Sequence, residues 1–248
     1  MWGTGIDRFR KTNARLNELH FKEAGDTYRH YLTIIDQRLP RAGLMVDLGA
    51  GSVSLDDYLT RLKQDGICVT AVDCDYNGLA SNHTSAKIMA RAEALPFREA
   101  TIDVVGASCF FEHVENPTRV LSECHRILKK GGVVVFYTPN RRSYVAAIAR
   151  YTPPSFHRLV RMLQTGRESH DVEVTETFYR MNTRSEIVRQ ARDFRVVSLE
   201  TYVGAPCYTG FMPPLVHLIF ILYHKFLQKV SWLRRIFGES IIGCLVKP

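Results

Sequence analysis

The stretch Val46-Asp47-Leu48-Gly49-Ala50-Gly51 ends an apolar run with an acidic residue and two glycines spaced by one residue. Glycines after a strand allow a tight turn and let a ligand approach the backbone at a helix N-terminus. The dinucleotide fingerprint G-x-G-x-x-G is incomplete, because Ser54 stands at its last position. An acid before the first glycine also suits a cationic ligand better than a pyrophosphate. The stretch therefore predicts a strand, a turn and a helix that together bind a ligand.

From residue 44 to 140, short apolar runs alternate with helical patterns, as is typical of parallel β-α-β units. Strands are expected at residues 44–48, 67–73, 87–91, 102–108, 133–137, 196–203 and 241–246. Helices are expected at residues 55–64, 77–81, 117–128 and 182–192. The predicted fold class is α/β, with a doubly wound, seven-stranded, mostly parallel sheet and helical cap insertions.

The pattern predicts a single domain over residues 1–248, with three segments outside the sheet. These segments are an N-terminal helical cap at 1–40, a cap insertion at 141–181 and a second insertion at 205–238. The remaining parts are the ligand-binding core at 41–140, a helix and the sixth strand at 182–204, and the last strand at 239–248.

Composition places the chain among soluble globular proteins, with 46% apolar and 23% charged residues in a length of 248. The sequence has no run of eighteen apolar residues that would cross a bilayer as a helix. Its N-terminus lacks the basic-then-apolar pattern of a secretion signal, so a cytoplasmic location is expected. Six scattered cysteines without a C-x-x-C pair predict reduced thiols and no metal site.

The formal net charge of +8 is compatible with several classes of partner. Nucleic acid, an anionic membrane surface and an anionic small substrate would each suit a basic protein. A basic surface that only contacts solvent is the remaining interpretation. Composition alone leaves these alternatives open.

A second motif lies twenty-odd residues after the glycine turn, where Val69-Thr70-Ala71-Val72-Asp73 ends a strand with a carboxylate. Such a carboxylate can accept hydrogen bonds from both hydroxyls of a ribose. An exposed aspartate without a ligand is the alternative, and Asp75 is a nearby competitor for the same role. The spacing from the glycine turn favours a ribose contact by Asp73.

Three further motifs follow in order. They are Ala92-Glu93-Ala94-Leu95-Pro96-Phe97, then Ile102-Asp103-Val104-Val105, and then the run from Ser108 through Phe111-Glu112-His113-Val114 to Arg126-Ile127-Leu128-Lys129-Lys130-Gly131-Gly132. In this order and spacing, the motifs resemble the class I S-adenosylmethionine (SAM)-dependent methyltransferase family, especially its quinone- and small-molecule-methylating branch. The resemblance covers about residues 44–140. It implies a Rossmann-like methyltransferase fold, SAM as cofactor and an enzyme that methylates a small molecule.

The resemblance also implies eight cofactor contacts. Those expected at the methionine part and the ribose are Asp47, Gly49, Gly51 and Asp73. Those expected at the adenine and beneath the sulfonium are Cys74, Ala92, Glu93 and Ser108. The chain departs from the family pattern at Val53, where a third glycine is usual, and at Arg91, where an aspartate is common.

A general base would help if the methyl acceptor is a phenol, an alcohol or an amine. His113 and Glu112 follow the fourth strand, where the family's substrate cleft opens, although His113 would equally suit a capping or packing role. The cap insertion offers further candidate bases at Glu173, Glu176 and Tyr179. The residues do not single out one of them.

Substrate contacts are expected from the basic and aromatic residues between 141 and 184. The candidates are Arg141, Arg142, His157 and Arg180. Arginine binds phosphate or carboxylate with two hydrogen bonds, so the cluster favours an anionic group on the substrate. The apolar residues 211–237, with lysines and arginines among them, would cap an apolar pocket, pack between subunits or lie on a membrane surface.

A substrate with an apolar body and an anionic head would use both insertions. A prenyl diphosphate methylated on carbon would fit, as would a prenylated phenol or quinone precursor methylated on oxygen or carbon. A SAM-binding partner protein without catalysis is the non-enzymatic alternative. Nucleic acid is ranked last, because Ser108-Cys109-Phe110-Phe111 replaces the N-P-P-Y motif used on flipped bases and the sequence has no recognisable RNA-binding module.

Overall fold

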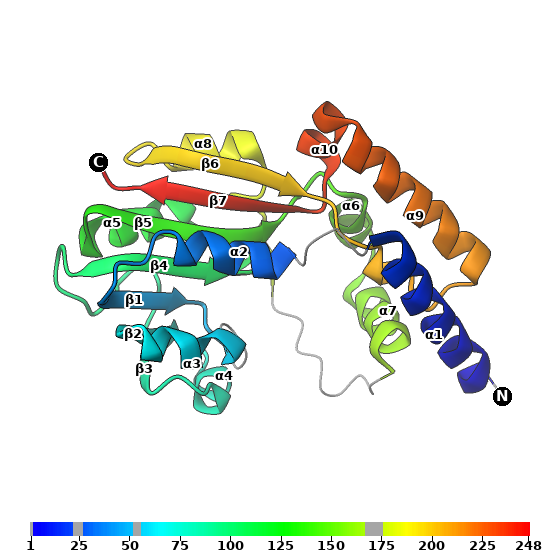
Figure 1. Cartoon of the computed structure of the whole chain (residues 1–248), viewed down its shortest axis with the longest axis horizontal. Helices are drawn as coiled ribbons and strands as arrows, with labels where there is room; N and C mark the ends of the chain where they lie inside the picture. Colours follow the sequence, from blue (N-terminus) through cyan, green and yellow to red (C-terminus); the bar gives the residue numbers. More distant parts are fainter. Residues whose placement is uncertain (1, 22–26, 52–55, 167–175) are drawn as a thin grey trace. The chain divides into compact units, whose positions relative to one another are not determined.

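The computed structural model of the chain describes residues 2–21, 27–51, 56–166 and 176–248 (Figure 1). Its internal contacts divide the chain into two compact units. The first, which we call the sheet unit, comprises residues 28–139, 177–200 and 241–248. The second, the helical unit, comprises residues 1–27, 140–176 and 201–240. The helical unit gathers most of the three segments that the sequence places outside the sheet, while the single domain stays a prediction.

The sheet has seven strands in the order β3-β2-β1-β4-β5-β7-β6. Their bounds are Gly43–Leu48 for β1, Ile67–Asp73 for β2, Ala86–Met89 for β3, Ile102–Ser108 for β4, Leu128–Pro139 for β5, Arg195–Tyr202 for β6 and Ser240–Val246 for β7. β1 pairs in parallel with β2 and β4, β2 with β3, and β4 with β5. The arrow of β7 runs opposite to that of β6 (Figure 1). The predicted α/β class with a seven-stranded, mostly parallel sheet is therefore confirmed.

The order of the strands reverses at β1, because β2 and β3 lie on one side of it and β4 to β7 on the other. In open α/β sheets, ligands bind outside the carboxyl ends of the strands at such a reversal. Asp47 of β1 and Gly106 of β4 are register partners here, and β1 ends one residue later. The glycine turn at 49–51 therefore begins at the edge of the sheet where a ligand is expected.

The central strands are buried on both faces, as parallel strands covered by helices must be. Residues 133–136 of β5 are all buried, and Phe136 meets the ring of Phe111 edge-on at a centroid distance of 5.4 Å. On the neighbouring strand β7, a Cβ added to Gly243 would lie only 2.2 Å from the Phe136 ring. The absence of a side chain at Gly243 thus makes room for the aromatic core.

The helices of the sheet unit are α2 (Thr27–Asp36), α3 (Asp56–Gln64), α4 (Tyr76–Ser81), α5 (Pro117–Ile127) and α8 (Arg184–Gln190), with a 3₁₀ turn η1 at Phe111–His113. Asn116 caps α5 by accepting a hydrogen bond from the backbone N–H of Arg119 at 3.2 Å, and Pro117 occupies its first turn. The apolar residues of α5 point into the core, as their spacing predicts: Val120, Leu121, Cys124 and Ile127 are buried. α5 therefore packs on the sheet beside η1.

Several bounds differ from the expected ones by one or two residues, and the start of β5 differs by five. β5 begins at Leu128, five residues before the predicted strand, because Leu128 already pairs with Ile102 and Lys129 binds Asp103 with Nζ and Oδ1 2.7 Å apart. α8 begins after Thr183, which accepts the N–H of Glu186 and donates to its carboxylate. The early start of β5 thus arises from contacts with a distant strand, whereas the start of α8 follows from a local cap.

The helical unit contains α1 (Trp2–Phe21), α6 (Tyr144–Tyr151), α7 (Pro154–Thr165), α9 (Pro214–Lys229), α10 (Ser231–Phe237) and the 3₁₀ turn η3 at Cys207–Thr209. Buried polar groups hold it together. His217 of α9 bonds to Thr209 at 2.7 Å and to Asn17 of α1 at 3.0 Å, and Arg10 Nε donates to the carbonyl of Leu163 at 2.8 Å. Among the described residues, no helix has the length and apolar character needed to cross a membrane.

Candidate functional site

The glycine turn after β1 needs glycine for two reasons. Gly49 and Gly51 have φ angles of +71° and +49°, in the left-handed region that other residues adopt only with strain. A Cβ added to Gly49 would lie 2.4 Å from the Phe110 ring, whereas one added to Gly51 would meet none of the described residues within 4 Å. The open space beside Gly51 fits a ligand that approaches the backbone. Val53, where the chain departs from the family pattern, lies outside the described residues.

Asp73, at the end of β2, lies directly against this turn. Its Oδ2 accepts the N–H of Gly51 at 2.8 Å, and its Oδ1 accepts the N–H of Asp75 at 2.9 Å. Each carboxylate oxygen has a further lone pair, so Asp73 can still accept ribose hydroxyls. Cys74, the residue predicted at the adenine face, follows it and is exposed. The ribose contact stays a prediction, but the position of Asp73 suits it.

Asp75, the competitor for the ribose, is already used by a helix cap. It is the N-cap of α4, and its carboxylate accepts the N–H of Asn77 at 3.1 Å and the N–H of Gly78 at 2.7 Å. A carboxylate in this position stabilises the first turn of the helix. Both carboxylates thus accept two backbone N–H groups, but only Asp73 bonds to the glycine turn, and its ribose contact stays a prediction.

Asp47 is buried near the end of β1, before the glycines, and has Gly106 of β4 as a register partner. Tyr31 of α2 lies close to it: burial raises the pKa of the Tyr31 phenol, and the charge of Asp47 raises it further. A Cβ added to Gly106 would lie 2.9 Å from the Tyr31 hydroxyl, so this glycine makes room for the tyrosine. Sequence analysis missed Tyr31, because it lies in a segment with no motif.

The loop after β3, which carries Ala92 and Glu93, is held in place from α5. Arg126 donates to the carbonyls of Leu95 and Phe97, both at 2.9 Å, while Glu123 accepts the N–H of Leu95 at 3.0 Å. The Glu123 carboxylate also pairs with Arg126 at 2.9 Å, which lowers the pKa of Glu123. Neither residue was among the predicted site residues, although their spacing of three on a helix is a recognisable signal of pairing.

Replacing Arg126 with alanine is expected to weaken SAM binding by about 5- to 30-fold, or ~1–2 kcal/mol, because the loop loses two charge-assisted hydrogen bonds. Calorimetric titration of the variant with SAM measures this change. Arg189→Ala, at an exposed position on α8, is the matched control and should bind as the native chain does. A folded Arg126→Ala variant with native affinity would show that the loop does not depend on this arginine.

Ser108 ends β4 beside the glycine turn, and Cys109 and Phe110 follow it. Ser108 is the last residue of the strand and pairs with Tyr137 of β5. Cys109 has a φ of +49°, and its N–H donates to the carbonyl of Tyr137 at 2.8 Å. This left-handed residue turns the chain away from the sheet and directs Phe110 onto Gly49. The predicted floor residue Ser108 thus lies at the same sheet edge as Gly49.

Glu112, one of the candidate bases, lies in a buried network. Its side chain is only 4% exposed and accepts a hydrogen bond from Thr138 at 3.0 Å, while Thr138 in turn accepts one from Asn182 at 2.7 Å. Burial raises the pKa of Glu112. Its carbonyl accepts the N–H groups of Phe178 at 2.8 Å and of Tyr179 at 3.2 Å. These contacts give Glu112 a structural role, and its role as a base stays a prediction.

The other candidate bases are distributed over both units. His113 is half-buried in η1 at the carboxyl edge of the sheet, and Tyr179 of the same unit has a φ of +50°. Glu176 ends the middle segment of the helical unit, and Glu173 lies outside the described residues. His113 follows β4 in η1, and its role as a base stays a prediction like that of the others.

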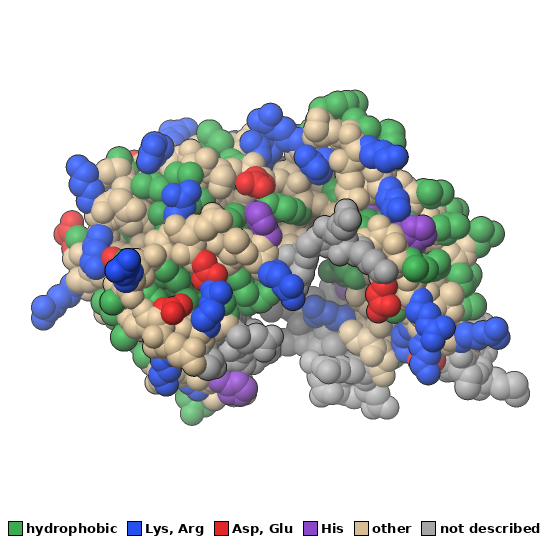
Figure 2. All heavy atoms as spheres, viewed as in Figure 1, with side chains coloured by type: hydrophobic (Ala, Val, Ile, Leu, Met, Phe, Trp, Pro, Cys, Tyr) green, Lys and Arg blue, Asp and Glu red, His purple; other side chains and the backbone are tan. Residues whose placement is uncertain are grey.

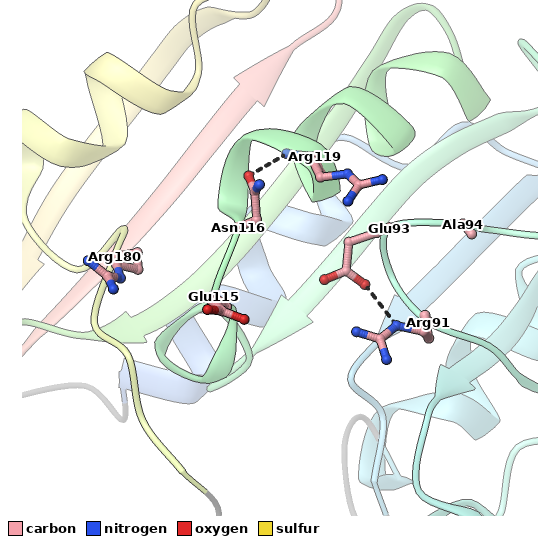
Figure 3. A pocket seen from close by; sticks show the side chains of 7 residues that line it. All are labelled: Arg91, Glu93, Ala94, Glu115, Asn116, Arg119 and Arg180. Atoms are coloured by element: carbon pink, nitrogen blue, oxygen red, sulfur yellow. Dashed lines mark hydrogen bonds and ion pairs between the residues drawn. The ribbon is translucent and has the colours of Figure 1, made fainter.

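A pocket of about 600 Å³ opens in the sheet unit (Figure 3). It is lined by Arg91, Glu93, Ala94, Glu115, Asn116, Arg119 and Arg180. Arg91 and Glu93 form an ion pair of 3.7 Å on one wall, drawn as a dashed line in Figure 3. The pocket thus brings together Glu93, predicted at the cofactor, and Arg180, predicted at the substrate. Sequence reasoning missed Arg119 and Glu115 as members of this group.

The remaining substrate candidates lie in the other unit. Arg141 and Arg142 precede α6 and are exposed, and His157 on α7 bonds through Nε2 to Thr152 Oγ1 at 2.7 Å. Arg180 belongs to the sheet unit. Of the four predicted substrate residues, it alone lines the pocket of Figure 3. The expected cluster of substrate contacts therefore divides between the two units.

Comparison with known proteins supports the same cofactor. A methyltransferase domain family matches residues 46–136. The chain is 32% identical to the ubiquinone biosynthesis O-methyltransferase of Paraburkholderia phytofirmans over 192 residues, which are 72% of this chain and 76% of the relative. It is 33% identical to the enzyme of the same name from Methylococcus capsulatus over 159 residues, and this match spans only 60% of each chain.

A solved SAM-dependent methyltransferase from Archaeoglobus fulgidus has the same fold, with a TM-score of 0.58 and 18% identity over 94% of this chain and 99% of that chain. These matches confirm the predicted family, fold and cofactor. The site agrees with them, because the glycine turn follows β1, where the strand order reverses, and Asp73 at the end of β2 bonds to it. The chain therefore belongs to the class I SAM-dependent methyltransferases, in their quinone-type branch, and its cofactor is SAM.

Proposed function

We propose that the chain transfers a methyl group from SAM to an oxygen of a prenylated phenol or quinone precursor that carries an anionic group. The observation that carries this proposal is the pocket of Figure 3, where Arg180 lines the same cavity as Glu93. The ubiquinone biosynthesis O-methyltransferases among the relatives support a phenolic acceptor. The anionic head of such a substrate would suit Arg180, and its apolar body would suit the apolar residues between 211 and 237.

Bound SAM supplies an activated methyl group that carries its own leaving group. The protein then has to align the acceptor oxygen, which in favourable cases contributes roughly 7–11 kcal/mol to catalysis. A phenol reacts faster when a base accepts its proton. We assign this role to His113, which lies in η1 directly after the strand that ends in Ser108.

Arg180 is held in a defined place by the backbone that precedes it. The N–H groups of Phe178 and Tyr179 both donate to the carbonyl of Glu112, and Glu112 is buried. A guanidinium on such a segment is presented to the pocket with little freedom of its backbone. It can bind a carboxylate or a phosphate with two parallel hydrogen bonds. Arg180 is thus the residue that would select an anionic substrate.

Replacing Arg180 with alanine is expected to raise KM for the substrate by about 10-fold, or ~1.4 kcal/mol, because one charge-assisted contact is lost. The affinity for SAM should stay native, since Arg180 is expected at the substrate. Steady-state kinetics and calorimetry on the same preparation test both statements. The exposed Arg192→Ala serves as the control, and an equal loss of SAM affinity in Arg180→Ala would reassign this arginine to the cofactor.

A second candidate function is methylation of a prenyl diphosphate on carbon. The observation that favours it is the number of guanidinium groups at the pocket, which Arg91, Arg119 and Arg180 supply together. Such a group of arginines suits a diphosphate better than a single carboxylate.

Incubation with methyl-labelled SAM distinguishes these functions. Prenylated phenols and prenyl diphosphates are offered separately, and the products are identified by mass. An O-methyl ether from the phenols supports the first function, and a diphosphate heavier by one methylene unit supports the second. Binding of SAM without turnover of either class would overturn both proposed substrate classes.

A further inference from the structure

Helix α9 has a buried face and, opposite it, an exposed face of apolar side chains. The inner face is buried within the helical unit and consists of His217, Ile221, His224 and Leu227. The outer face consists of Leu215, Ile219, Leu222 and Phe226, which are 76%, 61%, 61% and 54% exposed. Their spacing of four, three and four residues places them on one side of the helix. A surface helix of a soluble protein normally carries polar residues on that side.

The exposed apolar surface continues into α10. Trp232 is 63% exposed and Phe237 is 39% exposed, and α10 packs against α9. We call these six residues of α9 and α10 the α9–α10 surface. Figure 2 shows hydrophobic and basic side chains side by side along these helices. A continuous exposed apolar surface of this kind marks a site of interaction with another molecule or with a membrane.

The charged residues of the segment that carries α9 and α10 have a single sign. From residue 205 to 238 the sequence contains Lys225, Lys229, Arg234 and Arg235 and no acidic residue. Lys229 follows Leu222 by seven positions and Phe226 by three, so it lies on the outer face as well. Lysine and arginine can lay their aliphatic stems along apolar surface while their charged ends reach a polar layer. Apolar side chains with basic residues beside them match an anionic lipid headgroup layer.

We propose that the α9–α10 surface binds to the surface of an anionic lipid bilayer, with α9 lying in the plane of the headgroups. Neither helix is long and apolar enough to cross the bilayer. Apolar residues would enter the boundary between headgroups and acyl chains, and the nearby basic residues would be attracted to anionic lipid. A second copy of the chain is the less suitable occupant, because a twofold interface would bring the same cations together from both copies.

Flotation with lipid vesicles tests this proposal without any methyl acceptor. The full chain should bind vesicles of phosphatidylcholine with 30% phosphatidylglycerol and should remain free with phosphatidylcholine alone. Binding should weaken at high salt, because part of the attraction is electrostatic. In a Trp2→Phe background, Trp232 is the only tryptophan, and its emission should shift to the blue with the anionic vesicles. Absence of binding to the anionic vesicles would overturn the proposal.

A double variant with Leu222→Gln and Phe226→Gln is expected to reduce vesicle binding at least about tenfold, because two apolar side chains no longer enter the bilayer. Both positions are more than half exposed, so the fold should persist, and unchanged SAM binding verifies this. The matched control replaces the exposed Val188 and Val197 of the sheet unit with glutamine. Equal loss in both variants would overturn the proposal, as would a native dimer that dissociates only in the α9 variant.

Discussion

The Asp73→Ala variant is expected to bind SAM about 10- to 150-fold more weakly than the native chain, a loss of roughly 1.5–3 kcal/mol. The carboxylate lies against the glycine turn, where its Oδ2 accepts the N–H of Gly51 at 2.8 Å. Its remaining lone pairs would accept the ribose hydroxyls, and both interactions disappear with the carboxylate. Calorimetric titration with SAM and with its demethylated product measures the effect.

Asp75→Ala provides the comparison, because it removes a carboxylate two residues away. Asp75 caps α4, so its loss should reduce stability by about 1 kcal/mol while the affinity for SAM stays near native. A greater loss of affinity in Asp75→Ala than in Asp73→Ala would transfer the ribose contact to Asp75. A cofactor product that lacks the 2′-hydroxyl separates ribose binding from support of the turn. The native chain should bind this analogue more weakly than the normal product. The Asp73→Ala variant should bind the analogue and the normal product equally well.

The buried carboxyl of Glu239 is expected to make the folded state less stable as the pH rises from about 4.5 to about 7. Burial raises the pKa of Glu239 to about 7, whereas the unfolded chain has the ordinary value near 4.5. Between these values the unfolded chain releases its proton while the folded chain still binds one, so unfolding becomes easier with rising pH. The loss is complete above the folded pKa and amounts to about 3 kcal/mol.

His224 faces Glu239 and has the opposite dependence. Its Nε2 lies 3.6 Å from the Glu239 Oε1, and burial lowers the pKa of this fully buried imidazole. Its contribution to stability is present above pH 6.5 and decreases as the pH falls below that value. The contribution of Glu239 to stability is therefore the difference in the free energy of unfolding between the native chain and a Glu239→Gln variant. This variant retains an acceptor for the N–H of Gly204.

Urea unfolding at pH 4.5 and at pH 8 measures this difference. The native chain should lose about 3 kcal/mol relative to Glu239→Gln over this range, since only the native chain carries the raised carboxyl pKa. Glu18→Gln, at an exposed position on α1, is the control and should keep the native pH profile. Identical profiles for the native chain and Glu239→Gln would show that Glu239 titrates as an ordinary carboxyl group.

Much of the sheet unit follows from local sequence. The bounds of β2 and β4 agree with the expected strands, because each is a β-branched, apolar run that ends at a polar or turn residue. The positions of Asp73 and of the glycine turn relative to each other also follow, since parallel strands end at the same edge of a sheet. Local periodicity was less informative at β5, where Leu128 joins the sheet through its pairing with Ile102.

The contacts that the sequence did not reveal join residues far apart in the chain. Arg126 holds the loop at 95–97 from about thirty residues away, and Glu112 is buried through Thr138 and Asn182. Tyr31 reaches the neighbourhood of Asp47 from a helix that carries no motif. Such pairings depend on how the strands and helices pack, which spacing along the chain does not encode.

The sequence by itself determined the family, the cofactor and the glycine turn with its downstream carboxylate, because these depend on residue types at short, regular spacing. Only the tertiary structure showed that Asp75 caps a helix, while the ribose contact of Asp73 stays a prediction. It also decided that Arg180 and Glu93 share a pocket and that α9 has an exposed apolar face. The physical reason is that burial and hydrogen bonding are properties of neighbours in space, and most of these neighbours are distant in the sequence.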